Sequence, residues 1–407
     1  MKRRGPGAVR PLCGAALAAA LLLPVAAPAA AGQASAVPAA DGKRQELPPM
    51  PSALDPGAGE CTAASREKAE KQDWSRQRLD LTQVHRHGTG AGTTVALVDT
   101  GVRADAAGLG GRVTARGAAG DDCVGHGTFL AGLIVGEGWG RTRLPGVAPG
   151  AKLLALRGTD QNGSADAALV AQAVRDATAA GADVIVVGVA LPKRDEELTS
   201  AVAEAVDAGA VVVAAATPDP PNAGSRGETP TRTYWPAGEP GVLSVADMLP
   251  TGARPDDALP TDGVDLVAPG AGVVSGGPRG DGHYLGAGAS VAAAYTAGTA
   301  ALVRAARPDD TPEEIVHRLT ATAYPADIPQ LDAYAALTTV LGDAPVRAQA
   351  AAGPVTVRDT ASADRAANRA VVFVLLGTAG VLAVLWAVVA VPRARARGWR
   401  PADTGRD

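Results

Sequence analysis

The chain has 407 residues, long enough for two or three domains, and its 38 basic and 42 acidic residues give a formal net charge of −4. Arginines gather at both ends, so the sequence lacks the basic patch or stripe that is typical of nucleic-acid binding. Because only five histidines are present, a site that requires an imidazole has few candidates.

Residues 1–31 have the pattern of a secretory signal peptide. The cationic start "MKRRGPGAVR" precedes the apolar run "PLCGAALAAALLLPVAAPAAAG", which ends in small residues. Cys13 lies at the start of the apolar run, and we expect it to be removed with the signal after cleavage near Ala31. The mature protein is therefore predicted to be exported and to keep two cysteines, Cys61 and Cys123.

A proline-rich arm, residues 32–80, is expected to lead into a region of single-domain size, residues 81–341, in which strand-like and helix-like segments alternate. The strand-like segments are 93–99, 151–158, 182–190 and 210–216, and the helix-like segments are 127–136, 165–181 and 197–209. Continuous β-branched runs at 184–187 and 211–213 suit a parallel sheet that is buried on both faces. The rhythm predicts one α/β domain.

The C-terminal part has the pattern of a membrane anchor. A polar, alanine-rich stalk at 342–370 precedes 371–391, whose 21 residues carry no charge. As a helix this segment is about 31 Å long, enough to span a bilayer, although a buried core helix is the simpler alternative. Five arginines follow within 392–407, so the positive-inside rule predicts a cytoplasmic tail and an extracytoplasmic 81–341 domain.

Three motifs within the α/β domain carry candidate catalytic side chains. "VALVDTGV" places Asp99 at the carboxyl end of a strand, the edge of a parallel sheet where ligands collect. "DDCVGHGTFLAG" places His126 between two glycines at the start of an apolar helix, and "GAGASVAAAYTAG" places Ser290 where a small-residue turn opens a helix. Taken singly, Asp99 and Ser290 are explained as helix N-caps, and His126 as a hydrogen-bonded structural histidine.

Together the motifs occur in the order Asp, His, Ser, and the chain resembles the subtilisin-like serine peptidases from about residue 93 to 337. The resemblance implies a three-layer fold around a mostly parallel sheet. The signal, the arm, the cysteine beside the histidine motif, "DLVAPG" at 265–270, "DAYAALT" at 332–338 and the anchor are together similar to mycosins. Mycosins are the membrane-anchored subtilisin relatives of type VII secretion systems.

The resemblance implies a role for each residue of the triad. Asp99 would orient His126 and stabilise its cation, and His126 would take the proton of Ser290. Ser290 would attack a peptide carbonyl to form an acyl-enzyme that water hydrolyses. This chemistry requires no metal and no cofactor.

The two mature cysteines are expected to form a disulfide. In an oxidising compartment Cys61 can pair with Cys123 and tie the arm to the histidine loop. Two free buried thiols are the alternative.

The loop after "VVVAAA" departs from the family. There the family has Gly-Asn, whose asparagine donates to the oxyanion, and counting without a gap puts Thr217 and Pro218 on this pair. Proline has neither an N–H nor a side-chain donor, which leaves the Ser290 N–H as the expected donor, with Thr217 or Asn222 as substitutes. Gly188 stands where the family usually has a serine in the strand that pairs with substrate.

Two functions of different class follow. The first is a slow, narrowly specific serine endopeptidase that acts on exported proteins beside a type VII secretion membrane complex. The second is a pseudoprotease that serves as a structural part of such a complex. The intact triad favours the first, and Pro218 favours the second.

Overall fold

The computed structural model describes residues 46–57, 59–138, 144–220, 230–342 and 361–398, and divides the chain into two units, 1–341 and 342–407. The predicted signal peptide, the start of the arm, most of the stalk and the end of the tail lie outside the described residues.

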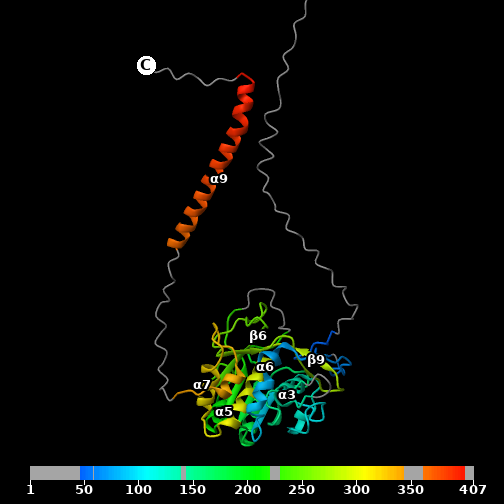
Figure 1. Cartoon of the computed structure of the whole chain (residues 1–407). Helices are drawn as coiled ribbons and strands as arrows, with labels where there is room; N and C mark the ends of the chain where they lie inside the picture. The colour runs from blue at the N-terminus through cyan, green and yellow to red at the C-terminus, as the bar shows by residue number, and fades with distance from the viewer. Residues whose placement is uncertain (1–45, 58, 139–143, 221–229, 343–360, 399–407) are drawn as a thin grey trace, which may run out of the picture. The chain divides into compact units, whose positions relative to one another are not determined.

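A sheet of seven parallel strands is the centre of the first unit (Figure 1). Its strands run in the order β2-β3-β1-β4-β5-β6-β7, and β8 and β9 form a separate antiparallel pair. The strands are β1 Thr94–Asp99, β2 Val113–Ala115, β3 Lys152–Arg157, β4 Val184–Val187, β5 Val211–Ala215, β6 Val242–Met248, β7 Leu266–Pro269, β8 Val273–Gly276 and β9 His283–Gly286. The predicted parallel sheet is confirmed.

Helices cover both faces of the sheet. Alternate residues of one strand point to opposite faces, so Leu97 packs in the cluster with α3 and α6, and Val98 in the cluster with α4. The helices are α1 Trp74–Arg78, α2 Leu81–His87, α3 His126–Val135, α4 Ala167–Ala179, α5 Glu196–Asp207, α6 Ala289–Ala306, α7 Pro312–Ala321 and α8 Ala333–Thr338, with a short 3-10 turn at Gly117–Gly120. This is the predicted three-layer fold.

The strand order determines where functional groups gather. From β1 the chain adds β2 and β3 on one side and β4 to β7 on the other, so the order reverses beside β1. A crevice at the carboxyl ends of the strands is the usual ligand site at such a reversal. Asp99 is the last residue of β1, and Gly188 follows the last residue of β4.

The described part of the arm packs as an integral piece of the first unit. The Met50 N–H donates to the Leu285 carbonyl on β9 at 2.7 Å. Arg76 on α1 forms a buried ion pair with Asp73 at 2.8 Å and also donates to the Val274 carbonyl. The described residues of the arm therefore form part of the packed first unit.

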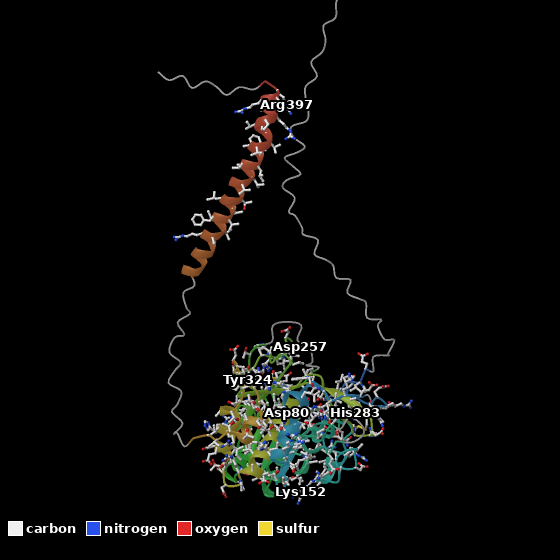
Figure 2. All side chains as sticks on the ribbon, in the orientation of Figure 1. Asp80, Lys152, Asp257, His283, Tyr324 and Arg397 are labelled. Carbon is white, nitrogen blue, oxygen red and sulfur yellow. A yellow bond between two sulfur atoms is a disulfide. The ribbon has the colours of Figure 1, made fainter. Side chains whose placement is uncertain are left out.

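The second unit contains one long apolar helix, α9 Ala361–Ala396. Its most apolar 18-residue window within residues 369–396 has a mean hydropathy of 2.6 and is exposed, and by length and composition this helix could cross a membrane. Figure 2 shows side chains along α9, with Arg397 just beyond its end. The predicted span 371–391 lies within α9, which also takes in the end of the predicted stalk because alanine favours helix.

Candidate active site

The structure brings Asp99, His126 and Ser290 together, although 164 residues separate the histidine from the serine. Nδ1 of His126 lies 2.8 Å from Oδ1 of Asp99, and Nε2 lies 3.1 Å from Oγ of Ser290. All three side chains are buried. The geometry is that of an acid, a base and a nucleophile in one hydrogen-bonded row.

Each glycine beside His126 occupies a position where a side chain would not fit or would strain the backbone. Gly125 precedes α3 at φ 92°, a left-handed conformation that favours glycine. A Cβ at Gly127 would lie 2.0 Å from the carbonyl oxygen of Gly101. The two glycines therefore let the start of α3 press against the turn that follows Asp99.

Asp122 holds this turn in place, and sequence reasoning missed it. Its carboxylate accepts hydrogen bonds from the N–H groups of Gly125 at 2.7 Å and Thr128 at 2.9 Å. It also accepts from the hydroxyls of Thr100 and Thr128. Burial raises the pKa of Asp122, while these four donors oppose the shift. The only sequence signal was its position between another aspartate and Cys123.

Replacing Asp122 by alanine is expected to lower the free energy of unfolding by about 3 kcal/mol, because several buried donors lose their acceptor. Urea unfolding measures this, with the exposed neighbour Asp121→Ala as the matched control. Equal midpoints for the two variants would contradict the assigned role.

Gly188 leaves room for the carboxylate of Asp99. A Cβ at this position would lie 2.2 Å from Oδ2 of Asp99, which is buried and has no hydrogen-bond partner within the described ranges. Oδ1 of Asp99 accepts the Thr100 N–H at 2.8 Å as well as the His126 ring N–H. Position 188 and the acid of the row are therefore packed against each other.

A fourth polar side chain, that of Asp219, joins the row. Its Oδ1 accepts the N–H of Ser290 at 3.1 Å, and its Oδ2 accepts the hydroxyl of Ser290 and lies 3.0 Å from Nε2 of His126. Thr217 is buried, and Pro218 lies between the two cavities beside Ser290. The side chain that reaches the Ser290 N–H thus comes one residue after Pro218, and Asn222 lies outside the described residues.

His126 lies between two carboxylates, and this determines its charge. Burial lowers the pKa of the imidazole, but the charges and hydrogen bonds of Asp99 and Asp219 outweigh burial and hold this pKa well above its usual value. The structure therefore favours the imidazolium form of His126.

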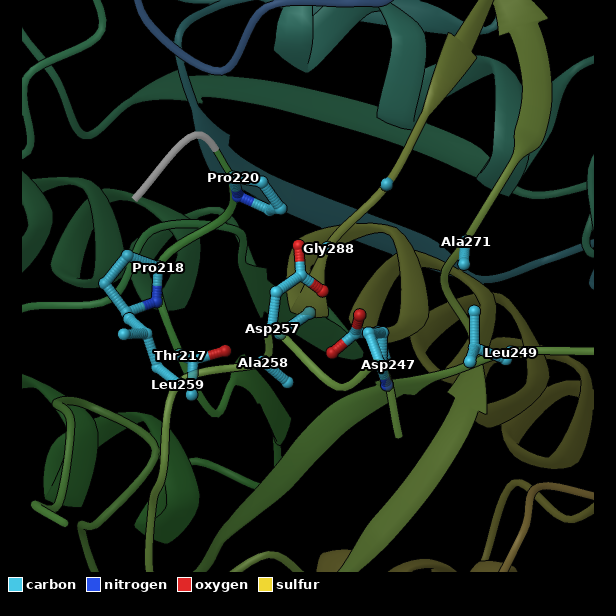
Figure 3. Close-up of a pocket in the computed structure, with 13 residues that line it drawn as sticks. Thr217, Pro218, Pro220, Asp247, Leu249, Asp257, Ala258, Leu259, Ala271 and Gly288 are labelled. Carbon is cyan, nitrogen blue, oxygen red and sulfur yellow. The ribbon is translucent and has the colours of Figure 1, made fainter. Parts of the chain in front are cut away.

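Two cavities adjoin Ser290. The first lies beside Gly288 and Ala289, and Figure 3 shows the carboxylates of Asp247 and Asp257 pointing into it. The second lies beside His126 and Gly188 and is also lined by Ser52 and Ala53 of the arm. A Cβ at Gly163 would lie 2.7 Å from the carbonyl oxygen of Ser52, so the arm closely covers one wall of this second cavity.

Cys61 and Cys123 are joined in a disulfide, as predicted. Next to it, the N–H of Thr62 donates to the carbonyl of Cys123 at 3.0 Å. The arm is thus attached to the loop that holds Asp122 and His126. Among the described residues, no three His, Cys, Asp or Glu side chains gather in a group that could hold a metal ion.

Comparisons with known proteins find similar chains. Residues 90–370 match the subtilase family, Peptidase_S8. Mycosin-1 of Mycobacterium tuberculosis is 35% identical over 303 residues, covering 61% of this chain and 68% of that protein. A solved structure of "a serine protease MycP1, an essential component of the type VII (ESX-1) secretion system" aligns with TM-score 0.60 and 28% identity, covering 72% of this chain and 100% of that one.

A chain from the "periplasmic assembly from the ESX-5 inner membrane complex" aligns with TM-score 0.61 and 25% identity. The alignment covers 77% of this chain and 96% of that one. The similarity to these proteins therefore extends over most of the first unit.

Proposed function

Because the chain belongs to the subtilase family of serine peptidases, we propose that it is a serine endopeptidase that acts through Asp99, His126 and Ser290. The observation that carries this proposal is the unbroken row from Asp99 Oδ1 to His126 at 2.8 Å and on to Ser290 Oγ at 3.1 Å. The second spacing allows the hydroxyl proton of Ser290 to pass to Nε2 of His126.

In the proposed reaction, neutral His126 accepts the hydroxyl proton of Ser290 while Oγ attacks the carbonyl carbon of a peptide bond. Asp99 holds the Nδ1–H and stabilises the imidazolium that forms. The protonated ring then donates to the leaving amine, and water hydrolyses the acyl-enzyme by the same route in reverse.

Slow turnover and narrow specificity are part of the proposal. The Ser290 N–H already donates to Asp219, so it is not available to an oxyanion. The raised pKa of His126 favours its protonated form, which cannot act as a base. Ser52 and Ala53 narrow the cavity beside His126, which favours an extended substrate strand over a bulky one.

We further propose that α9 anchors the peptidase to a membrane, with the first unit outside and the C-terminal tail in the cytoplasm. The apolar residues 371–391 and the arginines that follow support this orientation. The similarity to MycP1 and to the ESX-5 assembly supports a place beside a type VII secretion complex, with exported proteins as substrates.

A second candidate is a structural component of the complex without peptidase activity. The specific observation that favours it is that the carboxylate of Asp219 accepts hydrogen bonds from both the N–H and the hydroxyl of Ser290. A group at this place competes with a substrate carbonyl for the same donor.

Labelling with a fluorophosphonate separates the two candidates, because this probe forms a bond only with a serine that a neighbouring base activates. The full-length protein in detergent is expected to be modified, and peptide mapping to find the label on Ser290. Heat-unfolded protein is the control for non-specific reaction. A folded protein that takes up no label over hours would favour the structural candidate.

A further inference from the structure

The carboxyl group of Asp219 lies where the oxygen of a reacting carbonyl has to bind. When a serine hydroxyl attacks a peptide bond, the oxyanion accepts a hydrogen bond from the N–H of that same serine. Here Oδ1 of Asp219 accepts the Ser290 N–H at 3.1 Å and stands in for the oxyanion. The fit is close, since a Cβ at Gly288 would lie 2.0 Å from this oxygen.

The charge on this carboxyl group decides whether the site can react. As a carboxylate it repels an oxyanion and keeps His126 in the cationic form, which cannot accept the proton of Ser290. As a neutral acid it donates an O–H to the oxyanion and leaves His126 neutral. The two states differ by the position of one proton. Oδ2 of Asp219 and Nε2 of His126 are 3.0 Å apart, which is close enough for that proton to pass between them.

Several charged groups face this pair. Asp99 holds the far side of the His126 ring, and Asp247 on β6 and Asp257 in the following loop point into the cavity beside Gly288 (Figure 3). Burial raises the pKa of Asp247 to about 6, and repulsion from Asp219 adds to the rise, while Arg254 opposes it. Among the described residues, Asp247 and Asp257 thus place further carboxylates on the cavity side of the pair.

We propose that Asp219 is a catalytic residue that shares one proton with His126 and donates it in a hydrogen bond to the oxyanion. This inference rests on the proposed peptidase function. It assigns the oxyanion donor to an acid side chain next to Pro218.

The proposed sequence balances in protons and charge. Substrate displaces the carboxyl group from the Ser290 N–H, the Nε2–H bond of His126 breaks and an O–H bond forms on Asp219, with no change in net charge. Neutral His126 then takes the Ser290 proton while the Oγ–C bond forms and the carbonyl electron pair moves onto oxygen. That oxygen is held by the Ser290 N–H and the Asp219 O–H.

The pH profile tests this mechanism. Wild-type protein is expected to show a bell-shaped kcat/KM, because losing the shared proton removes the donor and adding a second proton removes the base. Asp219→Asn keeps a donor that does not titrate, so the alkaline limb should disappear. Its acid limb should move to lower pH, since His126 loses one of the carboxylates that raise its pKa.

Turnover provides the second readout. Asp219→Asn is expected to raise kcat by about 10-fold, and Asp219→Ala, which lacks any donor, should fall about 100-fold below Asp219→Asn and so about 10-fold below wild type; the scale is the one known for the oxyanion asparagine of subtilisin. The rate of fluorophosphonate labelling against pH should follow the same order. Exposed Asp207→Asn, at the end of α5, is the matched control and should retain the wild-type profile.

The outcomes separate the two proposals. If wild type cleaves peptides and Asp219→Asn has the same pH profile and turnover, the role of Asp219 is overturned and the peptidase function stands. If neither folded protein cleaves or takes up label, the peptidase function fails and the role of Asp219 fails with it. Thermal unfolding of each variant shows that the proteins compared are folded.

Discussion

Replacing Ser290 by alanine is expected to remove peptidase activity, with a fall in kcat of at least about 10³-fold; the corresponding loss in subtilisin itself is roughly 10⁶-fold. Alanine has no oxygen that can attack the peptide carbonyl, so the row from Asp99 through His126 ends without a nucleophile. The measurement is the release of new amino termini from a peptide mixture by the full-length protein.

The matched control is Ser200→Ala, an exposed serine on α5 whose hydroxyl bonds only Glu204 in the described structure. It should keep the wild-type rate. Because Ser290 Oγ also bonds Asp219, urea unfolding of both variants has to show intact folding. Residual turnover in folded Ser290→Ala above one tenth of wild type would mean that another residue carries the reaction.

Removing the disulfide by Cys61→Ser with Cys123→Ser is expected to lower the free energy of unfolding by about 4 kcal/mol. The bond joins residues 62 apart, and without it the unfolded chain regains the entropy of that loop. For a domain of this size the melting temperature should fall by roughly 10 °C. Activity should fall as well, because Cys123 is next to Asp122, whose carboxylate holds the backbone on either side of His126.

A reductant is the internal control for this prediction. Reduction of the wild type with dithiothreitol should lower its melting temperature to that of the double serine variant, and the variant itself should not respond. If wild type and the double serine variant have the same melting temperature without reductant, the disulfide does not stabilise the fold.

The parts predicted well from sequence are those that local patterns determine. The β-branched run at 184–187 coincides with β4, and the apolar run after His126 coincides with α3, because burial on both faces leaves a continuous hydrophobic signature. The grouping of Asp99, His126 and Ser290 is expected from the resemblance of the three motifs to the subtilisin-like peptidases, and in the structure these side chains form one hydrogen-bonded row.

The parts missed depend on backbone shape that no pattern encodes. Counting without a gap assumes that the loop after β5 follows the family's path, whereas the side chain that reaches Ser290 belongs to Asp219, one residue beyond Pro218. Asp122 escaped notice for a similar reason: its four donors come from a turn that brings Thr100 beside Thr128, 28 residues along the chain. Such contacts depend on the three-dimensional path of the turn, which the sequence pattern does not give.

The arm and the disulfide together determine what a single cut in the chain can release. Ser52 and Ala53, which line the cavity beside His126, precede Cys61, and residues 62–80 of the arm follow it. A cut before Cys61, in the exposed stretch around Asp55 and Pro56, would leave the residues that cover the cavity held by noncovalent contacts alone. A cut between Cys61 and α1 would instead yield a two-chain molecule whose smaller chain stays tethered through Cys123, with the cavity still covered.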